Sequence, residues 1–371
     1  MMVLPSISAA VVSLVLVVPP LWDHPGYDAE DSHHNPAETV INADRIRHVV
    51  KKWQAGLRTS AESCSGFGEP VLSGGRVYVS DQLGISAYAA ADGAVSWRYD
   101  WAYPGDSETP RLAVADGLLI VAGGDCNSQS DPDGEIIALD ARTGLPRWRL
   151  PVDVPVDSVV VDKSLVVISG GSPSDEDAVI AYHVRDGRQA WQKSRYLAAG
   201  VSADGTILAR ATDGSDVETG TSAGIAIATG SVRWTRKGKW TAQAASPGAE
   251  RFLVTDETGT LRSVRVSDGR LEWTAASFPS SESIMVDRNR VYRVSGRDVE
   301  ALNAADGKRV WTVRQKADGT QPAGAAGLIY TGAAVLNAAD GKVAGPDLPG
   351  RLIVAGGRIH QVVSGQLRTL G

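Results

Sequence analysis

The sequence predicts an all-β chain folded as an eight-bladed β-propeller of four-stranded blades. A tryptophan returns every 38 to 51 residues, and an Asp-Gly or Thr-Gly pair stands shortly before most of these tryptophans. A fixed period near 40 residues indicates one supersecondary unit copied many times. The recurring residues are Trp53, Trp97, Trp148, Trp191, Trp234, Trp273 and Trp311.

Each repeat contains four short strands. In the unit that ends at Trp97, apolar runs at residues 69–72, 76–80, 85–89 and 95–99 are separated by Gly and Asp-Gly turns. Val, Ile, Tyr and Trp suit a half-buried pleated surface, and Asp-Gly supplies the positive φ of a tight hairpin. No repeat shows a period of 3.6, so helices should be few. Four-stranded units of this length are typical of propeller blades.

The two chain ends predict the number of blades. The seventh unit has Gly345 where its tryptophan is expected, and only three strands follow it, at residues 351–354, 358–363 and 366–370. The strand around Trp53 has no unit of its own. Pairing it with the last three strands completes an eighth blade and removes two open sheet edges. A seven-bladed ring is the alternative if the last unit packs differently.

The motif at residues 138–148 resembles the tryptophan-docking motif of the PQQ-like (quinoprotein-type) β-propeller repeat family. Its fixed positions here are Ala138, Asp140, Thr143, Gly144 and Trp148. The resemblance covers residues 35–371 and implies that the tryptophan of one blade stacks on the next blade. The family's quinone dehydrogenases carry an adjacent Cys pair and an acidic set that holds Ca²⁺. This chain matches neither, so the resemblance implies a non-catalytic branch without a cofactor.

The first 44 residues differ from the repeats. Residues 7–18 form an apolar run that is too short to span a bilayer but suits a secretory signal. We therefore expect a signal-like segment at 1–20, a polar leader at 21–44 and one propeller domain at 45–371. The leader contains His33 and His34; a metal site there is one hypothesis, and a disordered polar leader is the preferred one. The expected location is extracellular or in the cell envelope, with no stable membrane anchor after signal cleavage; a cytoplasmic protein with an apolar tail is the alternative.

The only two cysteines are also consistent with export. Cys64 lies in the segment leading into the first blade, and Cys126 lies between the second and third strands of the second blade. In an up-and-down blade both loops open on the same face, so a disulfide between neighbouring blades is geometrically possible. The alternative is two unrelated thiols.

Acidic loops on that face suggest a possible metal site. Oxygen ligands in number suit Ca²⁺, and the loop of the second blade supplies the candidates Asp131, Asp133 and Glu135. The alternative is that these are solvated hairpin tips.

Aromatic residues in the loops that lead into blades predict a binding funnel. First strands of propeller blades line the central channel, so aromatics near their start could rim it and hold a ligand. The candidate ligand-binding residues are Trp101, Tyr103, Tyr196, Trp240 and Phe278. The alternative is that they cover the ends of the blades.

The net charge of −6 and the pI near 5.6 argue against a nucleic-acid partner. We therefore expect a binding or scaffold module for a protein or an envelope glycan, with no catalysis and no cofactor. The alternative is an enzyme, such as a PQQ- or metal-dependent oxidoreductase, with its site in the central funnel. Buried titratable groups converging in the funnel would favour the enzyme.

Overall fold

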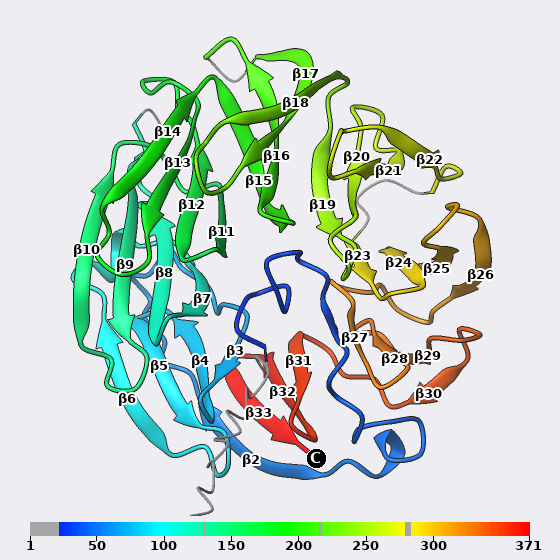
Figure 1. Ribbon diagram of the computed structural model, residues 1–371. Coiled ribbons are helices and arrows are strands. Elements are labelled where there is room, and N and C mark those ends of the chain that lie inside the picture. Colours follow the sequence, from blue (N-terminus) through cyan, green and yellow to red (C-terminus); the bar gives the residue numbers. More distant parts are fainter. Residues whose placement is uncertain (1–21, 129–130, 215–216, 279–282) are drawn as a thin grey trace, which may run out of the picture.

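The computed structural model describes residues 22–128, 131–214, 217–278 and 283–371, and these form eight antiparallel sheets arranged around one axis (Figure 1). Blade 1 consists of β3 (Val71–Ser73), β4 (Arg76–Asp81), β5 (Gly84–Ala89) and β6 (Val95–Asp100), and blade 2 of β7 (Arg111–Ala115), β8 (Leu118–Gly124), β9 (Gly134–Asp140) and β10 (Pro146–Val152). Blade 3 consists of β11 (Ser158–Asp162), β12 (Leu165–Gly170), β13 (Ala178–His183) and β14 (Gln189–Ser194), and blade 4 of β15 (Tyr196–Ala203), β16 (Thr206–Thr212), β17 (Glu218–Ala226) and β18 (Val232–Lys237).

The second half of the ring repeats this order. Blade 5 consists of β19 (Thr241–Ala245), β20 (Arg251–Thr255), β21 (Leu261–Arg265) and β22 (Leu271–Thr274), and blade 6 of β23 (Ser283–Val286), β24 (Arg290–Ser295), β25 (Asp298–Asn303) and β26 (Arg309–Arg314). Blade 7 consists of β27 (Ala323–Ala325), β28 (Leu328–Tyr330), β29 (Val335–Asn337) and β30 (Val343–Gly345), and blade 8 of β31 (Arg351–Ala355), β32 (Arg358–Val363), β33 (Gln366–Leu370) and β2 (Lys51–Gly56). The helices in the described residues are two 3₁₀ turns, η1 (Ile46–His48) and η2 (Pro104–Asp106).

The predicted closure of the ring is confirmed. Strand β2 pairs antiparallel with β33, so the beginning and the end of the repeat region share blade 8, with Trp53 opposite Thr369. This arrangement gives eight blades and excludes the seven-bladed alternative. No covalent bond joins the first strand of the repeat region to the last one. The hydrogen bonds between β2 and β33 therefore keep the ring closed.

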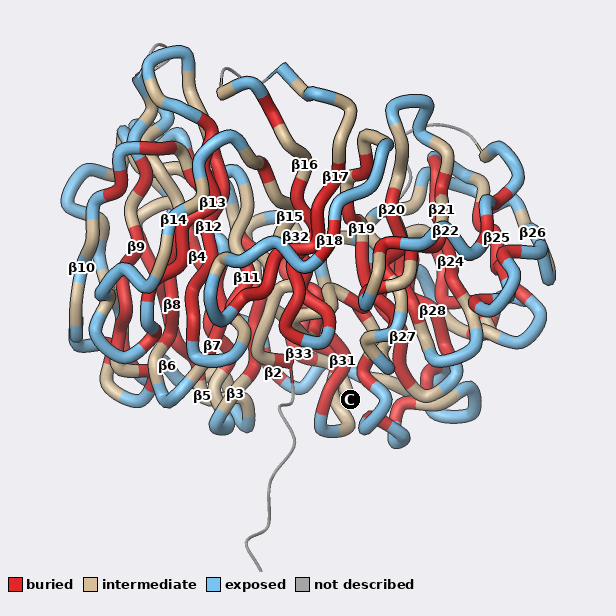
Figure 2. The backbone as a smooth tube through the Cα atoms, turned by 45° about the horizontal axis from the view of Figure 1, so that its top comes forward, coloured by how far each residue is buried: buried red, intermediate tan, exposed pale blue. Residues whose placement is uncertain are grey.

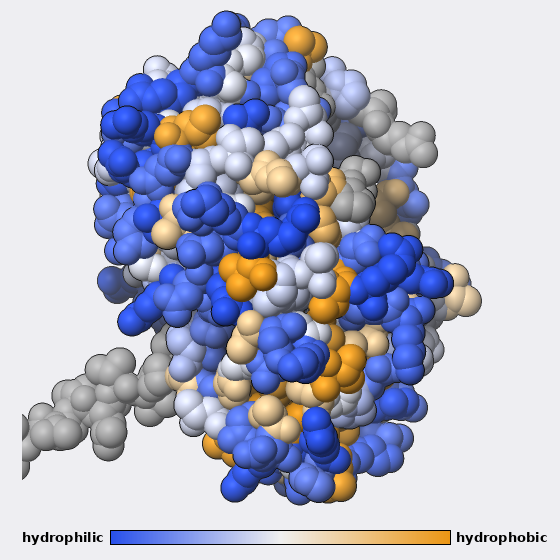
Figure 3. Space-filling model, turned by 90° about the vertical axis from the view of Figure 1, so that its right-hand side faces the viewer, coloured by the Kyte–Doolittle hydropathy of each residue, from blue (hydrophilic) through white to orange (hydrophobic). Residues whose placement is uncertain are grey.

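Burial follows the position of a strand in its blade. All six residues of β12 are buried, whereas β14 at the outer edge of the same blade has only exposed and half-buried residues. Figure 2 shows the buried backbone in the middle of the blades and exposed backbone in the loops. On the side of the outer wall seen in Figure 3, apolar side chains occur as separate spots among polar ones.

At seven of the eight junctions between blades, a tryptophan on the outer strand of one blade contacts the next blade. The indole N–H of Trp97 donates to the carbonyl of Ala141 at 3.1 Å, and its ring lies against Gly144. A Cβ atom at Gly144 would stand 2.6 Å from the ring, so only glycine fits in this turn. The other six indole donors pair in the same way: Trp53 with Ala90, Trp148 with Val184, Trp191 with Ile227, Trp234 with Val266, Trp273 with Ala304 and Trp311 with Ala338.

The junction between blades 7 and 8 uses a different device. Gly345 occupies the position where a tryptophan is expected, and fully buried Ile46 of η1 fills the space above it. A Cβ atom at Gly345 would stand 2.6 Å from Cγ1 of Ile46. The neighbouring Arg47 donates from Nε to the carbonyl of Ala344 at 2.9 Å. The segment before the first blade thus replaces the missing indole.

The expectation of a disordered leader at 21–44 is wrong. Residues 22–35, which we call the axial strap, run through the centre of the ring (Figure 1), and their strand β1 (His34–Asn35) pairs in parallel with β27. Trp22 is 1% exposed and belongs to the same apolar cluster as Ile41 and Ile46. The leader is polar in composition, but its large apolar residues Trp22, Tyr27 and Ile41 are buried, whereas Val40 is exposed. The signal-like segment 1–20 lies outside the described residues.

Candidate functional site: a funnel closed by the axial strap

The axial strap is hydrogen-bonded to every blade of the ring. It meets the innermost strands in the order of the blades, at distances of 2.7 to 3.2 Å. The pairs, from blade 1 to blade 8, are Trp22 with Leu72, Asp23 with Val114, His24 with Val161, Ala29 with Ser202, Glu30 with Ala245, Ser32 with Val286, His33 with Gly324, and Asn35 with Val354. Most bonds are between backbone groups; His24 and Asn35 use their side chains.

These contacts close the channel at one face. The bonded positions on the inner strands, such as Ser202 in β15 and Ala245 in β19, lie towards the strands' C-terminal ends. The N-terminal ends, such as Arg111 and Ser158, instead line a cavity of about 980 Å³. We call the face where the inner strands begin the open face. The channel is therefore a blind funnel that opens there, with the strap as its floor.

His24 fixes the floor to blade 3. Its Nδ1 contacts Oδ1 of Asp23 at 2.7 Å and its Nε2 contacts the carbonyl of Val161 at 2.8 Å. A carboxylate and a carbonyl are both acceptors, so these two contacts favour a proton on each ring nitrogen. Burial lowers the pKa of His24, but the hydrogen bond and charge of Asp23 outweigh it and leave the pKa raised. Both nitrogens are occupied, so this histidine has no free position for acid or base catalysis.

Three further titratable groups of the strap, Asp28, Glu30 and His33, have raised pKa values. Burial raises the pKa of Asp28 to about 6, although its carboxylate accepts hydrogen bonds from the backbone N–H and hydroxyl of Ser32. Burial and the charge of Asp28 raise the pKa of Glu30 to about 7. Burial lowers the pKa of His33, but the charge of Asp31, 3.6 Å away, outweighs this and the net shift is upward. Asp28 and His33 thus each contact another residue of the strap, Ser32 and Asp31.

The funnel wall is polar and carries both signs of charge. Arg111 donates to the carbonyl of Val156 at 3.0 Å, and Arg351 lies 3.6 Å from Glu69. Burial raises the pKa of Glu108, while Arg111 lowers it. Phe67 contributes an aromatic ring at the rim. Such a lining can hold a polar chain by hydrogen bonds and ion pairs.

The five predicted aromatics do not gather around this funnel. Trp101 and Tyr103 border a cavity of about 190 Å³ beside blade 2, and Trp240 borders a third cavity between blades 4 and 5. Tyr196 lies under Lys193, and Phe278 is stacked by Arg293. The expectation that they rim the funnel is therefore corrected, because none of the five is among the residues that line its cavity. Whether they bind a ligand stays a prediction.

Two of the three acidic candidates have side-chain partners. Glu135 forms an ion pair with Arg149, and Asp131 accepts from the hydroxyl of Ser174. The backbone N–H of Asp133 donates to Asp125. Within the described parts of the chain, no three His, Cys, Asp or Glu side chains are placed to hold a metal ion.

The predicted disulfide is confirmed. Cys64 and Cys126 are bonded, with their Cα atoms 6.6 Å apart, and so link blade 1 to blade 2 on the open face. The two cysteines are far apart in sequence, and only the alternation of loops between the two faces places them together. A crosslink over this separation stabilises by roughly 4 kcal/mol in the chain-entropy description.

The funnel does not fit a quinone with its calcium ion. The two cysteines are 62 residues apart in sequence and not adjacent. Of the carboxylates that line the funnel, Asp28 is bonded to Ser32 and Glu69 faces Arg351. No step of a quinone reaction can be assigned to these residues.

Sequence reasoning missed the strap, although a signal was present. Trp22 stands outside the tryptophan period, and Tyr27, Ile41 and Ile46 follow it at irregular spacing. Large apolar residues in an otherwise polar leader indicate a segment that packs against a surface.

In the described residues no helix is long and apolar enough to cross a membrane.

Comparison with known proteins agrees with this architecture. A family model described as outer membrane protein assembly factor BamB matches residues 83–237 and 218–354. The protein of that name from Bordetella pertussis is 28% identical over 314 residues, which are 77% of this chain and 73% of that one. A putative dehydrogenase XoxF from Paracoccus denitrificans is 25% identical over 173 residues, covering 41% of this chain and 27% of that protein.

Two solved structures show the same fold at low identity. Quinohemoprotein alcohol dehydrogenase from Comamonas testosteroni superposes with a TM-score of 0.70 at 14% identity, covering 95% of this chain and 80% of that one. BamB from Moraxella catarrhalis superposes with a TM-score of 0.60 at 17% identity, covering 87% and 97%. Propellers of this shape therefore occur in proteins named as enzymes and in proteins named as assembly factors, and fold alone does not separate them.

Proposed function

Because this chain belongs to the PQQ-like β-propeller family whose model is described as outer membrane protein assembly factor BamB, we propose that it is an exported binding module for a protein of the cell envelope. It carries out no reaction of its own in this proposal. The relatives named as assembly factors support a protein partner over an envelope glycan. The disulfide on the open face agrees with an oxidising compartment.

The observation that carries the proposal is the blind, polar funnel. Its floor contains buried histidines and carboxylates, which alone would suit an enzyme. However, both nitrogens of His24 are bonded to acceptors, and Asp28 accepts two hydrogen bonds from Ser32. A catalytic acid or base needs a position free to reach substrate. The funnel therefore offers a rigid, polar binding surface.

Site-specific photo-crosslinking in the producing cell tests this proposal. Phe67 at the funnel rim is replaced by benzoylphenylalanine, and Val343, which is 66% exposed on the outer strand of blade 7, serves as the matched control. We expect one envelope protein to be crosslinked from position 67 and not from position 343. Equal products from both positions, or none from position 67, would count against the funnel as the binding surface.

The enzyme alternative has its own test. The dehydrogenase relatives and the titratable floor are the observations that favour it. Native mass spectrometry with added PQQ and Ca²⁺ measures whether either binds. We expect no stoichiometric adduct, because the funnel carboxylates Asp28, Asp31 and Glu69 already have partners. A one-to-one adduct of PQQ would replace the binding-module proposal by the enzyme.

A further inference from the structure

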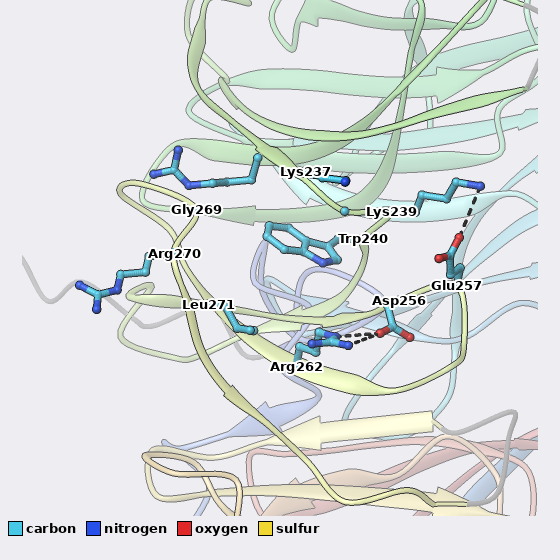
Figure 4. Close-up of a pocket in the computed structure, with 11 residues that line it drawn as sticks. Lys237, Lys239, Trp240, Asp256, Glu257, Arg262, Gly269, Arg270 and Leu271 are labelled. Carbon is cyan, nitrogen blue, oxygen red and sulfur yellow. Dashed lines mark hydrogen bonds and ion pairs between the residues drawn. The ribbon is translucent and has the colours of Figure 1, made fainter.

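The cavity beside Trp240 has a volume of about 500 Å³ and lies between the outer strand of blade 4 and blade 5, away from the funnel (Figure 4). Its wall on blade 4 is residues 236–240, the end of β18 and the link into β19. Its wall on blade 5 comes from Asp256, Glu257, Arg262 and the turn at 269–271. We call this cavity the basic groove.

The basic groove carries more positive than negative charge. Five of its side chains are cationic and two are acidic. Arg262 is paired with Asp256 at 2.7 Å, and Lys239 lies 3.5 Å from Glu257. Throughout the described ranges, Arg236, Lys237 and Arg270 have no carboxylate partner. The groove is therefore locally basic, although the chain as a whole has a net charge of −6.

Trp240 adds a hydrogen-bond donor to the groove. It is 8% exposed, and Figure 4 shows its indole with Lys237 and Lys239 on one side and Arg262 on the other. The seven repeat tryptophans all donate their indole N–H to the next blade. The indole N–H of Trp240 has no acceptor among the residues described. A bound anion would supply one.

We propose that the basic groove binds an extended acidic segment of a partner protein. Arg270 lies at one end of the groove and Lys239 at the opposite end (Figure 4). Cations spread along a groove match carboxylates spread along a chain, whereas a single compact anion would reach only one end. Complementary charge raises the association rate and selects the partner. The groove is separate from the funnel, so this site stands whether or not the funnel binds a protein.

The test measures binding of a fluorescein-labelled hexaglutamate peptide by fluorescence anisotropy at low salt. The test variant is Lys237→Gln with Arg270→Gln. The control variant is Lys308→Gln with Lys342→Gln, which changes the net charge equally. Arg270, Lys308 and Lys342 each follow the Asp-Gly pair of their own blade, so the control removes charge from equivalent turns.

The test variant should bind the peptide about fivefold or more weakly, because each exposed ion pair contributes modestly. The control should stay within about twofold of the parent, and raising the salt to about 0.5 M should abolish parent binding through charge screening. All variants should share the parent's melting temperature. Equal weakening in test and control variants, or no binding by the parent, overturns the proposal.

A second arm separates the peptide from a lipid surface. Binding of phosphatidylglycerol vesicles is measured for the parent, the test variant and the control variant. If the parent binds vesicles through Lys237 and Arg270 but does not bind the peptide, the groove recognises a lipid headgroup and the peptide proposal is wrong.

The variant Trp240→Phe keeps an aromatic ring but lacks the indole N–H. We expect it to bind the peptide about two- to threefold more weakly than the parent.

Discussion

The interfaces between blades and the axial strap stabilise the same ring in opposite ways. At the outer wall one contact, an indole on a turn glycine, is repeated seven times and joins only neighbours. At the axis a single segment that is never repeated touches all eight blades. Repeated nearest-neighbour contacts give local stability that can be lost one blade at a time. The strap couples blades that do not touch one another, so the ring should unfold as a unit while the strap is bound.

The largest effect should follow from removing the strap. A chain that begins at residue 36 loses the contacts to all eight blades and the buried side chain of Trp22. We expect a loss on the order of 5 kcal/mol, from one buried indole and several hydrogen bonds. Thermal unfolding measures it, with a chain that begins at residue 21 as the control. Identical melting of the two chains would show that the strap only fills space.

Loss of one blade contact should be smaller and local. Trp97→Ala removes a buried indole and its bond to Ala141, and should destabilise by about 3–5 kcal/mol. Complete unfolding should stay cooperative because the strap is still bound, but hydrogen exchange by local opening should speed up in blades 1 and 2 and stay unchanged in blades 5 and 6. Trp97→Phe, which keeps a ring, is the milder control. A uniform increase around the ring would contradict the neighbour-only description of the outer wall.

The junction of blades 7 and 8 tests whether the leader can replace an indole. Ile46→Ala should destabilise by about 2–4 kcal/mol, because Ile46 is fully buried above Gly345. Ile46→Val, which removes one methylene, should cost about 1 kcal/mol. Denaturant unfolding of both variants gives the comparison. If Ile46→Ala has no effect, Ile46 does not take the place of the missing indole between blades 7 and 8.

The smallest effect is a pH dependence confined to the strap. Asp28 and Glu30 have folded pKa values of about 6 and about 7, above their ordinary values of 3.8 and 4.5. Their contribution is therefore complete below pH 4 and is lost as pH rises through 6 and 7. The raised pKa values of His24 and His33 act in the same direction, while burial lowers the pKa of His34 and opposes them.

We therefore expect the strap to be more tightly held at pH 5 than at pH 8.5, by on the order of 1–2 kcal/mol after allowance for solvent screening. Hydrogen exchange of residues 22–35, corrected for the intrinsic effect of pH, measures this difference. Asp28→Asn with Glu30→Gln should flatten the profile between these two values. Stronger protection at pH 8.5 would show that the histidines or carboxylates titrate in the opposite direction.

The ring could be predicted from the sequence because its signals are local. Each blade repeats the same turn and tryptophan, so the positions of Trp97 and Gly144 follow from spacing alone. The placement of Trp101 and Trp240 did not follow, because a loop between blades can point towards the axis or outward at the same sequence spacing. Of the unpaired cations of the basic groove, Arg236 and Lys237 are near Trp240 in the sequence, whereas Arg270 is brought to the groove only by the fold.

The sequence by itself determined the number of blades, the closure by the strand around Trp53 and the partners of the disulfide, since these depend on periodicity and on alternation of loops between two faces. Only the tertiary structure decided what fills the axis. The strap has no repeat and little regular structure, and its contacts with the blades need eight inner strands already assembled in a ring. A segment that is positioned by such non-local hydrogen bonds leaves no periodic pattern in its own sequence.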